Sequence, residues 1–301
     1  MNTLWGLWYT TGAAGPVDVT GLSNAGGFES TQTLRRRPSM PVIALLTDFG
    51  TRDHYVAAMK GVILQVNPRA LLVDITHEIE PQQVREAAFV LRQVFPCYPE
   101  KTIFVAVVDP TVGTSRRILA ARYNGRYVIA PDNGLLTFVH RDAELEEMRV
   151  VENRVLMAGK LSATFQGRDI MAPVAGHLSL GVPMDRLGPP ADRIEIFHSA
   201  RPTFGRDGSI EGEVLFIDRF GNLITNISEL DVTAARFPGP SHEVELGSRS
   251  IGPIRATYAD VPRGEPVALF GSTQMLEIAV NGGSAAAALG AHRGDPVCIH
   301  P

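Results

Sequence analysis

The sequence predicts an α/β protein: an N-terminal α/β domain with a mainly parallel central sheet, followed by a smaller C-terminal all-β domain that is barrel-like. From residue 41 to about residue 110, short apolar runs alternate with segments of helical periodicity, as in a parallel sheet covered by helices. After residue 200, short β-rich segments separated by glycine and proline replace the helical pattern, which is typical of a small antiparallel sheet or barrel. The proline-rich stretch 187–202 separates the two patterns and places the domains at residues 40–195 and 203–301.

The elements of the N-terminal domain follow in order from the apolar pattern. The run VIALLT (42–47) ends in a polar turn, as a buried parallel strand does. Helical spacing over 53–66 predicts a helix that an Asn-Pro pair ends, and ALLVDI (70–75) is a second buried strand. Residues 81–95 predict a second helix with a proline near its start, and TIFVAVVD (102–109) predicts a third strand.

Composition and charge exclude several classes of protein. A formal net charge of −4 over 301 residues gives no basic footprint for nucleic acid, and no apolar run approaches the length needed to cross a membrane. Cys97 and Cys298 make neither a metal spacing nor a disulfide framework, so we expect a reducing cytoplasm and two buried thiols. Residues 1–39, rich in Gly, Ser and Thr, are expected to form a disordered N-terminal extension.

Aspartates follow or end the three predicted strands, and they suggest a site. Asp48, Asp74 and Asp109 lie near the carboxyl ends of the strands, where ligands of parallel sheets bind. Arg116 follows Asp109 by seven residues, and a loop of that length can bring it back against the carboxylate. The alternatives are aspartates that cap the following helices and an ion pair that only ties down a loop.

Three further stretches carry polar groups in turns. In FQGRDIMAP, Arg168 can bind an anion or pair with an aspartate; in FIDRFGN, an aromatic lies between two polar groups, although Gly-Asn is also ordinary hairpin chemistry. Small residues around Asn281 allow the backbone to approach a ligand closely. The sequence has no phosphate-binding loop, metal-ligand cluster or nucleophile elbow. The residues alone therefore predict an acidic, amide-rich site for a small uncharged or cationic ligand.

As a set, the motifs resemble a known family. TDFGTRDHYVAAMKGVI, VDITHEIEP, VVDPTVGTSRR, APDNGLL, FQGRDIMAPVAGHL, FIDRFGNLITNI and LEIAVNGGSAA are similar, in this order, to the S-adenosyl-L-methionine (SAM) hydrolases. These enzymes are also called SAM hydroxide adenosyltransferases and are relatives of the fluorinases and chlorinases. The resemblance implies an α/β domain followed by a β-barrel domain, and a homotrimer that binds SAM between subunits.

The resemblance also implies roles for particular residues. Asp48 would bind the ribose hydroxyls, because a carboxylate accepts two hydrogen bonds. Asp218 and Ser272 would bind the methionine part, and Phe220 and Tyr258 would pack against the adenosine. Asn222 and the backbone of Asn281 and Gly282 would recognise the adenine, and Phe165 and Gly167 would face the ligand. Gln82 stands where the fluorinases have tryptophan.

The hydrolases hold one water with Asp, Arg and His, and here the resemblance places Asp109, Arg116 and Gln166 in these positions. Thr111 is a second departure, because the hydrolases have glycine there. Methionine leaves the sulfonium as a neutral thioether, so the reaction needs no general acid, no metal and no cofactor. The implied activity is SN2 attack of water on C5′, with Asp109 accepting the proton, which gives adenosine and L-methionine.

Two alternatives differ from hydrolysis. Because Gln166 cannot take a proton, the protein could bind SAM or adenosine with weak or no turnover. A SAM-dependent halogenase is the other alternative, but an ionised Asp109 would repel a halide.

Overall fold

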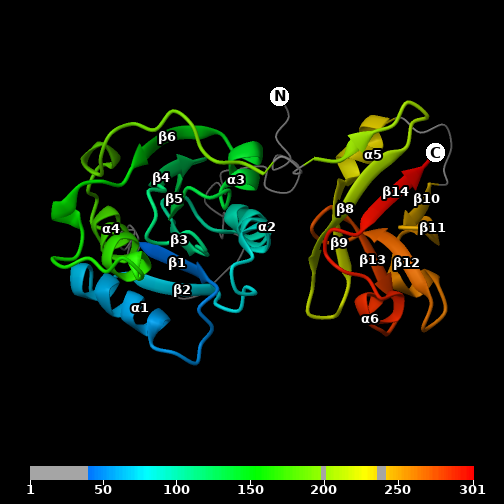
Figure 1. The fold of residues 1–301 in the computed structure, drawn as a ribbon, viewed down its shortest axis with the longest axis horizontal. Helices are drawn as coiled ribbons and strands as arrows, with labels where there is room; N and C mark the ends of the chain where they lie inside the picture. Colours follow the sequence, from blue (N-terminus) through cyan, green and yellow to red (C-terminus); the bar gives the residue numbers. More distant parts are fainter. Residues whose placement is uncertain (1–39, 198–200, 236–241) are drawn as a thin grey trace, which may run out of the picture. The chain divides into compact units, whose positions relative to one another are not determined.

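The computed structural model describes residues 40–197, 201–235 and 242–301, so the predicted extension at residues 1–39 lies outside the described residues. The chain divides into two compact units (Figure 1). Of the described residues, the first unit comprises 40–82, 94–133 and 139–194, and the second comprises 83–93, 134–138, 195–197, 201–235 and 242–301. The domain boundary between residues 195 and 203 stays a prediction.

The first unit is built on a six-stranded mixed sheet in the order β2-β1-β3-β5-β4-β6. Its strands are β1 (Val42–Thr47), β2 (Leu71–Thr76), β3 (Ile103–Val107), β4 (Ile118–Tyr123), β5 (Arg126–Pro131) and β6 (Leu145–Val150). The pairings among β2, β1, β3 and β5 are parallel, and β4 pairs antiparallel with β5 and β6. The predicted α/β domain with a mainly parallel sheet is therefore confirmed.

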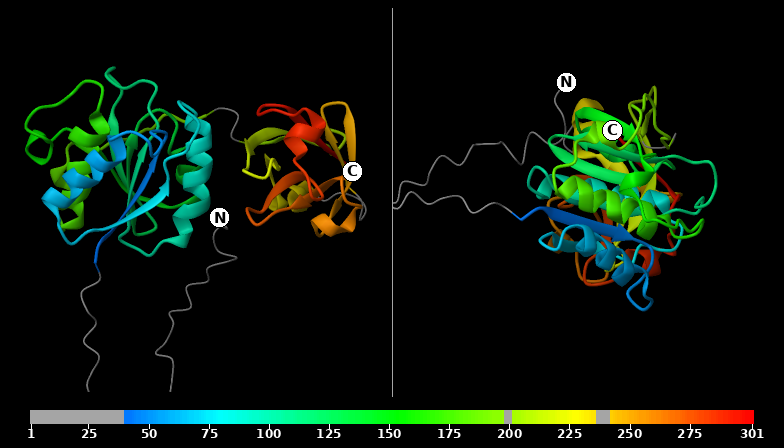
Figure 2. Two further views of the ribbon diagram at one scale, coloured as in Figure 1. Left: turned by 90° about the horizontal axis from the view of Figure 1, so that it is seen from below. Right: turned by 90° about the vertical axis from the view of Figure 1, so that its left-hand side faces the viewer.

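Helices α1 (Tyr55–Val66) and α4 (Ala172–Ser179) lie side by side against this sheet (Figures 1 and 2). They can pack closely because Gly176 of α4 has no side chain: a Cβ there would lie 2.7 Å from the Cβ of Val66. A π-helix, Gly167–Met171, leads directly into α4. The other helical segments of this unit are α3 (Thr137–Asp142), which begins in the second unit, and the short turns Phe95–Cys97, Arg154–Leu156 and Met184–Arg186.

The second unit contains a closed β-barrel of seven strands, as the sequence predicts. The strands follow the order β14-β10-β11-β12-β13-β9-β8, and a pairing of β14 with β8 closes the barrel. Their bounds are β8 (Ile210–Ile217), β9 (Leu223–Ser228), β10 (Glu243–Leu246), β11 (Arg249–Arg255), β12 (Pro266–Phe270), β13 (Met275–Val280) and β14 (Pro296–His300), and the short β7 (Thr203–Phe204) adds to β8.

Helices in the second unit depart partly from expectation. The predicted helix near residues 81–95 forms as α2 (Val84–Val94), and its apolar side chains share a core with β8, β9 and β13: Ala88, Phe89, Phe138, Leu215, Ile224 and Met275. The apolar pattern did not predict α5 (Glu229–Ala235) or α6 (Ala285–Leu289). Both are only two turns or less, too short for helical periodicity to stand out. The hydroxyl of Ser284 caps α6 by accepting from the N–H of Ala287.

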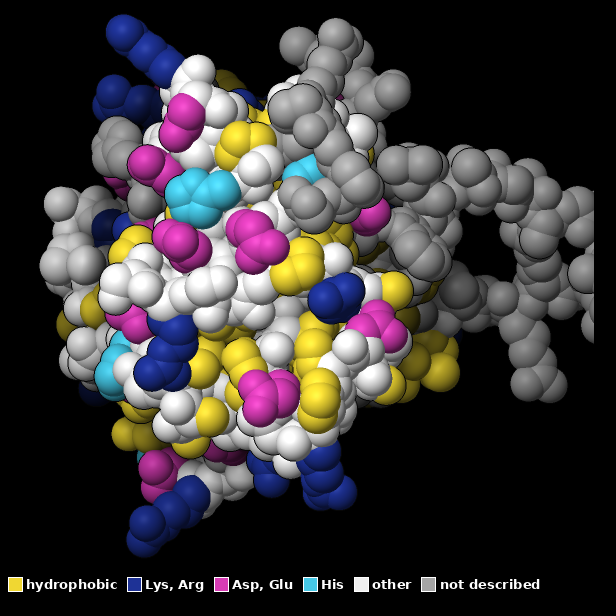
Figure 3. Space-filling model, turned by 90° about the vertical axis from the view of Figure 1, so that its right-hand side faces the viewer, with side chains coloured by type: hydrophobic (Ala, Val, Ile, Leu, Met, Phe, Trp, Pro, Cys, Tyr) yellow, Lys and Arg dark blue, Asp and Glu magenta, His cyan; other side chains and the backbone are white. Residues whose placement is uncertain are grey.

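Surface features bear on three further expectations. The thiol of Cys298 is half-buried, but Cys97 is exposed, so its predicted burial is wrong; Cys97 ends a short turn after α2 rather than a core strand. Within the described residues, no helix is long and apolar enough to cross a membrane. The face in Figure 3 shows acidic and basic side chains interspersed with small apolar areas, and its described part has no continuous basic surface of the kind that binds nucleic-acid backbones.

Candidate functional site

Asp109 and Arg116 form a buried ion pair at the end of β3. The Nε of Arg116 donates to both carboxylate oxygens, at 2.9 and 2.8 Å, and its Nη2 also donates to Oδ2. The side chains are only 5% and 7% exposed, respectively, so solvent screens the pair weakly. The predicted return of Arg116 against Asp109 is confirmed. Because the guanidinium donates hydrogen bonds to both oxygens of the carboxylate, the orientation of Asp109 is fixed.

The loop between Asp109 and Arg116 is held by its own threonines. Thr111 Oγ1 donates to Asp109 Oδ1 at 3.0 Å, and Thr114 Oγ1 donates to the carbonyl of Thr111 at 2.8 Å. On the other side, the amide of Asn133 donates to the carbonyl of Val108 at 2.9 Å. Asp109 therefore receives a hydroxyl hydrogen bond from the residue that stands where the hydrolase pattern has glycine.

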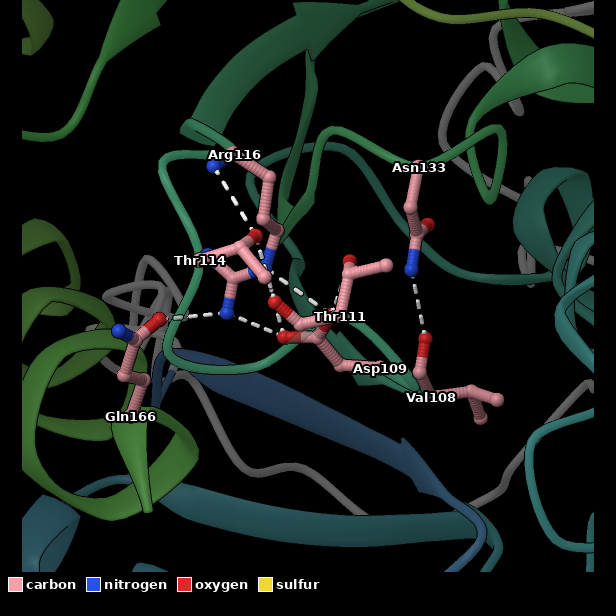
Figure 4. A network of polar contacts seen from close by, with 7 residues as sticks. All are labelled: Val108, Asp109, Thr111, Thr114, Arg116, Asn133 and Gln166. Atoms are coloured by element: carbon pink, nitrogen blue, oxygen red, sulfur yellow. Dashed lines mark hydrogen bonds and ion pairs between the residues drawn. The ribbon is translucent and has the colours of Figure 1, made fainter. Parts of the chain in front are cut away.

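Gln166 joins this pair from a distant part of the chain. It immediately precedes the π-helix, and its Oε1 accepts from Arg116 Nη2, so that Arg116 lies between Asp109 and Gln166 (Figure 4). Guanidinium is a donor only, so the amide oxygen has to face Arg116. The Nε2 group of Gln166, a donor only, is then the end of the amide that can meet a ligand.

Asp48 lies at the same edge of the sheet, directly after β1. Thr47 pairs with Val107 in the parallel register, which brings the ends of β1 and β3 together. Burial raises the pKa of Asp48, the hydrogen bond from the N–H of Gln82 at 2.9 Å opposes this shift, and the charge of Asp109 adds to it. Asp48 and Asp109 thus act on each other electrostatically.

Asp74 does not join this pair, although it belongs to the predicted set of strand-end aspartates. It lies inside β2, opposite Leu45, and its carboxylate pairs with Lys60 at 2.6 Å and His77 at 3.0 Å. The candidate site therefore contains two of the three aspartates.

An aromatic pocket of about 370 Å³ borders the network. Phe165 is 7% exposed, and its ring meets Phe49 and Tyr55 edge-on, with centroids 5.9 and 5.1 Å away. The guanidinium of Arg168 lies 4.8 Å from the centroid of Phe165. The complete lining consists of Phe49, Tyr55, Ser162, Thr164, Phe165 and Arg168. Adjacent residues thus contribute to two parts of the site, Phe165 to the pocket and Gln166 to the ion-pair network.

Two expectations concern the neighbouring turn. Gly167 is buried, and a Cβ there would lie 3.3 Å from the Sδ of Met59, so the core lies against this residue; its ligand-facing role stays a prediction. Arg168 pairs with Asp169 through two hydrogen bonds of 2.6 and 3.0 Å, which favours the ion-pair alternative over anion binding.

A second group of candidate residues lies in the second unit, at the β8–β9 turn. Asp218 accepts the backbone N–H groups of Phe220 and Asn222 at 2.8 and 2.9 Å, and the amide of Asn222 donates to its other oxygen at 3.0 Å. The turn displays Phe220, whose side chain is left 76% exposed. The predicted strand-turn-strand arrangement is confirmed, and its aromatic residue is free to stack on a planar ring.

Tyr258 and a residue that the sequence did not single out lie near Asp218. The hydroxyl of Tyr258 donates to Glu277 Oε1 at 2.6 Å. Burial raises the pKa of Tyr258 to about 12, with the hydrogen bond to Glu277 and the charge of Asp218 adding to the effect. Glu277 is 5% exposed, and burial and Asp218 both raise its pKa. The signal that could have revealed Glu277 is a charged residue inside the buried run MLEIAV.

Ser272 and the Asn281–Gly282 segment occupy the adjoining turns. Ser272 is exposed between β12 and β13, next to Gly271, where a Cβ would come within 2.4 Å of Glu277 Oε2. The side-chain amide of Asn281 donates to the carbonyl of Val261 at 2.8 Å, so this side chain stabilises a turn. Just beyond, the N–H of Ala286 donates to the carbonyl of Gly221, which ties this segment to the β8–β9 turn. The candidate residues thus form one group in each unit.

Within the described ranges, no group of three or more His, Cys, Asp or Glu side chains could hold a metal ion. The polar groups of the candidate site in the first unit are carboxylates, an amide, hydroxyls and the guanidinium groups of Arg116 and Arg168.

Comparison with known proteins agrees with this inventory. The SAM hydroxide adenosyltransferase N-terminal domain matches residues 43–188, and the C-terminal domain of the same family matches residues 212–298. A Thermus thermophilus protein named (R)-S-adenosyl-L-methionine hydrolase is 42% identical over 86% of this chain and 99% of its own length. A fluorinase from an Actinoplanes species is 31% identical over 80% of this chain and 91% of its own length.

Solved structures give the same result. The crystal structure of an uncharacterised conserved protein from Thermotoga maritima is 38% identical and covers 86% of this chain and 100% of its own, with a TM-score of 0.80. The seven motifs, the α/β unit, the closed barrel and both family models thus agree. The chain belongs to the SAM hydroxide adenosyltransferase family.

Proposed function

We propose that this protein is a SAM hydrolase, in which water attacks C5′ of SAM and gives adenosine and L-methionine. The observation that carries the proposal is the Asp109–Arg116–Gln166 network, with Asp48 at the same edge of the sheet. The network offers a fixed carboxylate to accept a proton and fixed donors to orient a water.

The reaction forms one bond, breaks one bond and transfers one proton. The water oxygen bonds to C5′ as the C5′–S bond breaks, and the sulfur takes the bonding pair and loses its charge. The water proton passes to Asp109, which is the acceptor in the network. Arg116 holds that carboxylate in one orientation and so restricts the direction from which water can approach.

Gln166 contributes position but takes no proton. Its oxygen faces Arg116, and its Nε2–H group can donate to a lone pair of the attacking water. This donor leaves the water protons free to point toward Asp109. A histidine at the same place would add a second proton acceptor, which hydrolysis through Asp109 does not need.

The remaining candidate residues bind the substrate. In the first unit, Asp48 would accept the ribose hydroxyls and Phe165 would line the ligand pocket. In the second unit, Asp218 and Ser272 would bind the methionine end of SAM. Phe220 and Tyr258 would pack against the adenosine. Asn222 and the backbone of Asn281 and Gly282 would hydrogen-bond to the edge of the adenine. We propose a homotrimer in the cytoplasm, with each site completed at a subunit interface.

Incubation of the pure protein with SAM tests the activity. We expect adenosine and methionine in equal amounts by chromatography, with no requirement for added metal or halide. Tight SAM binding without adenosine would favour the binding-protein alternative, which the inability of Gln166 to take a proton keeps open. A 5′-halo product that appears only with chloride or fluoride would favour halide transfer instead.

The variant Gln166→His tests which group accepts the proton that the attacking water loses. If Asp109 accepts it, the histidine variant should change kcat by less than about tenfold, well below the ~10²–10⁴-fold typical of a missing acid–base group. Single-turnover adenosine release measures this directly, with Gln166→Met as the control that removes the donor and keeps the length of the side chain. A gain of a hundredfold or more in the histidine variant would show that positioning without a second acceptor is insufficient.

A further inference from the structure

A chain of polar side chains leads from the buried Thr47, which precedes Asp48, to Lys60 at the surface, and the proposed reaction uses none of its members. The hydroxyl of Thr47 lies 2.9 Å from His77 Nδ1, and His77 Nε2 lies 3.0 Å from Asp74 Oδ1. Lys60 Nζ contacts the other oxygen of Asp74 at 2.6 Å. Thr47 is fully buried and His77 is 4% exposed, so the chain connects the core to the surface salt bridge.

The chemistry of the end groups favours one direction for the hydrogen bond between Thr47 and His77. The carboxylate of Asp74 only accepts, so its 3.0 Å contact with Nε2 favours the ring form in which Nε2 carries a proton. In the neutral ring Nδ1 is then an acceptor, and the Thr47 hydroxyl donates to it. The oxygen of Thr47 in turn accepts the backbone N–H of Phe49 at 3.2 Å. In this arrangement the Thr47 hydroxyl links the ring of His77 to the backbone of Phe49.

A carboxylate, an imidazole and a hydroxyl in this order resemble a nucleophilic triad. Burial argues against that function. The Thr47 hydroxyl has no exposed surface and already accepts the N–H of Phe49, so no substrate can reach it in this conformation. This chain of polar side chains has a structural role instead.

The polar side chains support the short loop that carries Asp48. His77 holds the loop twice, through its ring to Thr47 and through its carbonyl, which accepts the N–H of Gly50 at 2.7 Å. Asp48 lies between these two attachments. Its carboxylate accepts the N–H of Gln82, a residue held at a positive φ of 67°. The loop that carries the carboxylate is thus attached to His77 at the side chain of Thr47 and at the backbone of Gly50.

We propose that His77 is a positioning residue that acts through Thr47 to hold the Asp48 carboxylate in place for the two hydroxyls of a ribose. The inference rests on the proposed function, in which Asp48 binds the ribose of SAM. Loosening the link should weaken ligands that carry the diol and leave ligands without it unaffected.

Thr47→Val, paired with Thr47→Ser, provides the test. Valine has nearly the shape of threonine but leaves His77 Nδ1 and the N–H of Phe49 without a partner, whereas serine keeps the hydroxyl. For Thr47→Val we expect the Kd of adenosine to rise on the order of tenfold, with the Kd of 2′,3′-dideoxyadenosine unchanged. Thr47→Ser should restore adenosine binding to within about twofold of the natural protein. Isothermal calorimetry measures both ligands.

Tyr123→Phe is the matched control. The Tyr123 hydroxyl contacts His140 Nδ1 at 3.0 Å in the same unit, and Tyr123 is fully buried. Both substitutions remove a buried hydroxyl that contacts a histidine, so both should lower the melting temperature, but only Thr47→Val should change the ratio of the two Kd values. Equal losses for both ligands in Thr47→Val, or an unchanged adenosine Kd, would overturn the proposal.

If Thr47→Val does not fold, His77→Gln replaces it. Glutamine can reach Asp74 with its amide but loses the acceptor at the Nδ1 position, and the same selective loss of adenosine is expected. These measurements use binding alone, so they remain decisive if no variant releases adenosine from SAM. Absence of adenosine release in the natural protein would count against hydrolysis, whereas an unselective loss of binding would count against His77 as a positioning residue.

Discussion

Asp109→Asn should lower kcat for adenosine release by about 10²–10⁴-fold and leave KM for SAM within a few-fold of the natural value. The carboxamide has nearly the same size but cannot accept the proton that water loses. It also leaves Arg116 without a bidentate anionic partner. Because these interactions act on the attacking water and not on bound SAM, the loss should fall on the chemical step.

Asp132→Asn is the matched control for this variant. Asp132 also accepts two hydrogen bonds from one guanidinium, Arg117 Nε and Nη2 at 3.0 and 2.7 Å, and its side chain is likewise 5% exposed. The control should lose a similar amount of stability and keep its rate. Equal loss of rate in both variants would mean that Asp109 matters for folding alone, and full activity of Asp109→Asn would mean that another group accepts the proton.

Asp48→Asn should raise the KM for SAM by about tenfold to a hundredfold, with a smaller change in kcat. An ionised carboxylate can accept from both ribose hydroxyls, whereas the amide offers one acceptor, and each charge-assisted hydrogen bond contributes on the order of tenfold or more to binding. Steady-state kinetics with SAM measures the split between KM and kcat. An unchanged KM would remove Asp48 from the ribose site.

The same variant should be as stable as the natural protein at neutral pH, or more stable. Burial raises the pKa of Asp48 above its ordinary 3.8, so the folded state binds this proton more tightly than the unfolded state does. Its contribution to stability is therefore present below pH 3.8 and is lost as the pH rises through the folded pKa. Asparagine removes the buried charge and can still accept the N–H of Gln82.

The raised pKa also predicts a pH dependence of binding. As the pH falls toward the folded pKa, Asp48 gains a proton and loses an acceptor, so the affinity for adenosine should fall. In Asp48→Asn this component should disappear. Titrations of adenosine binding at several pH values check the prediction, and a slope that persists unchanged in the variant would assign it to another group.

Sequence reasoning succeeded where partners are close along the chain. The seven-residue separation of Asp109 and Arg116 sufficed to predict their contact, and the apolar runs predicted the sheet and the barrel. Gln166 lies 50 residues beyond Arg116, and only the resemblance to the family connected the two in advance. Contacts of that separation depend on how elements pack, which periodicity does not encode.

Other features were missed for identifiable reasons. The π-helix that places Gly167 against Met59 was not predicted, because no local pattern signals the extra residue in its turn. Glu277 lies in an apolar strand pattern that gave no reason to expect a partner 19 residues away. The link between Thr47 and His77 requires β1 and β2 to be neighbours, which follows only from the sheet order.

The contact between Gln166 and Arg116 has a consequence for how this site can change over generations. Glutamine and histidine codons differ only in the third base, so one transversion at codon 166 exchanges the carboxamide for an imidazole. The backbone before the π-helix already points this side chain at Arg116. A library of random point mutants therefore reaches the histidine form in a single step.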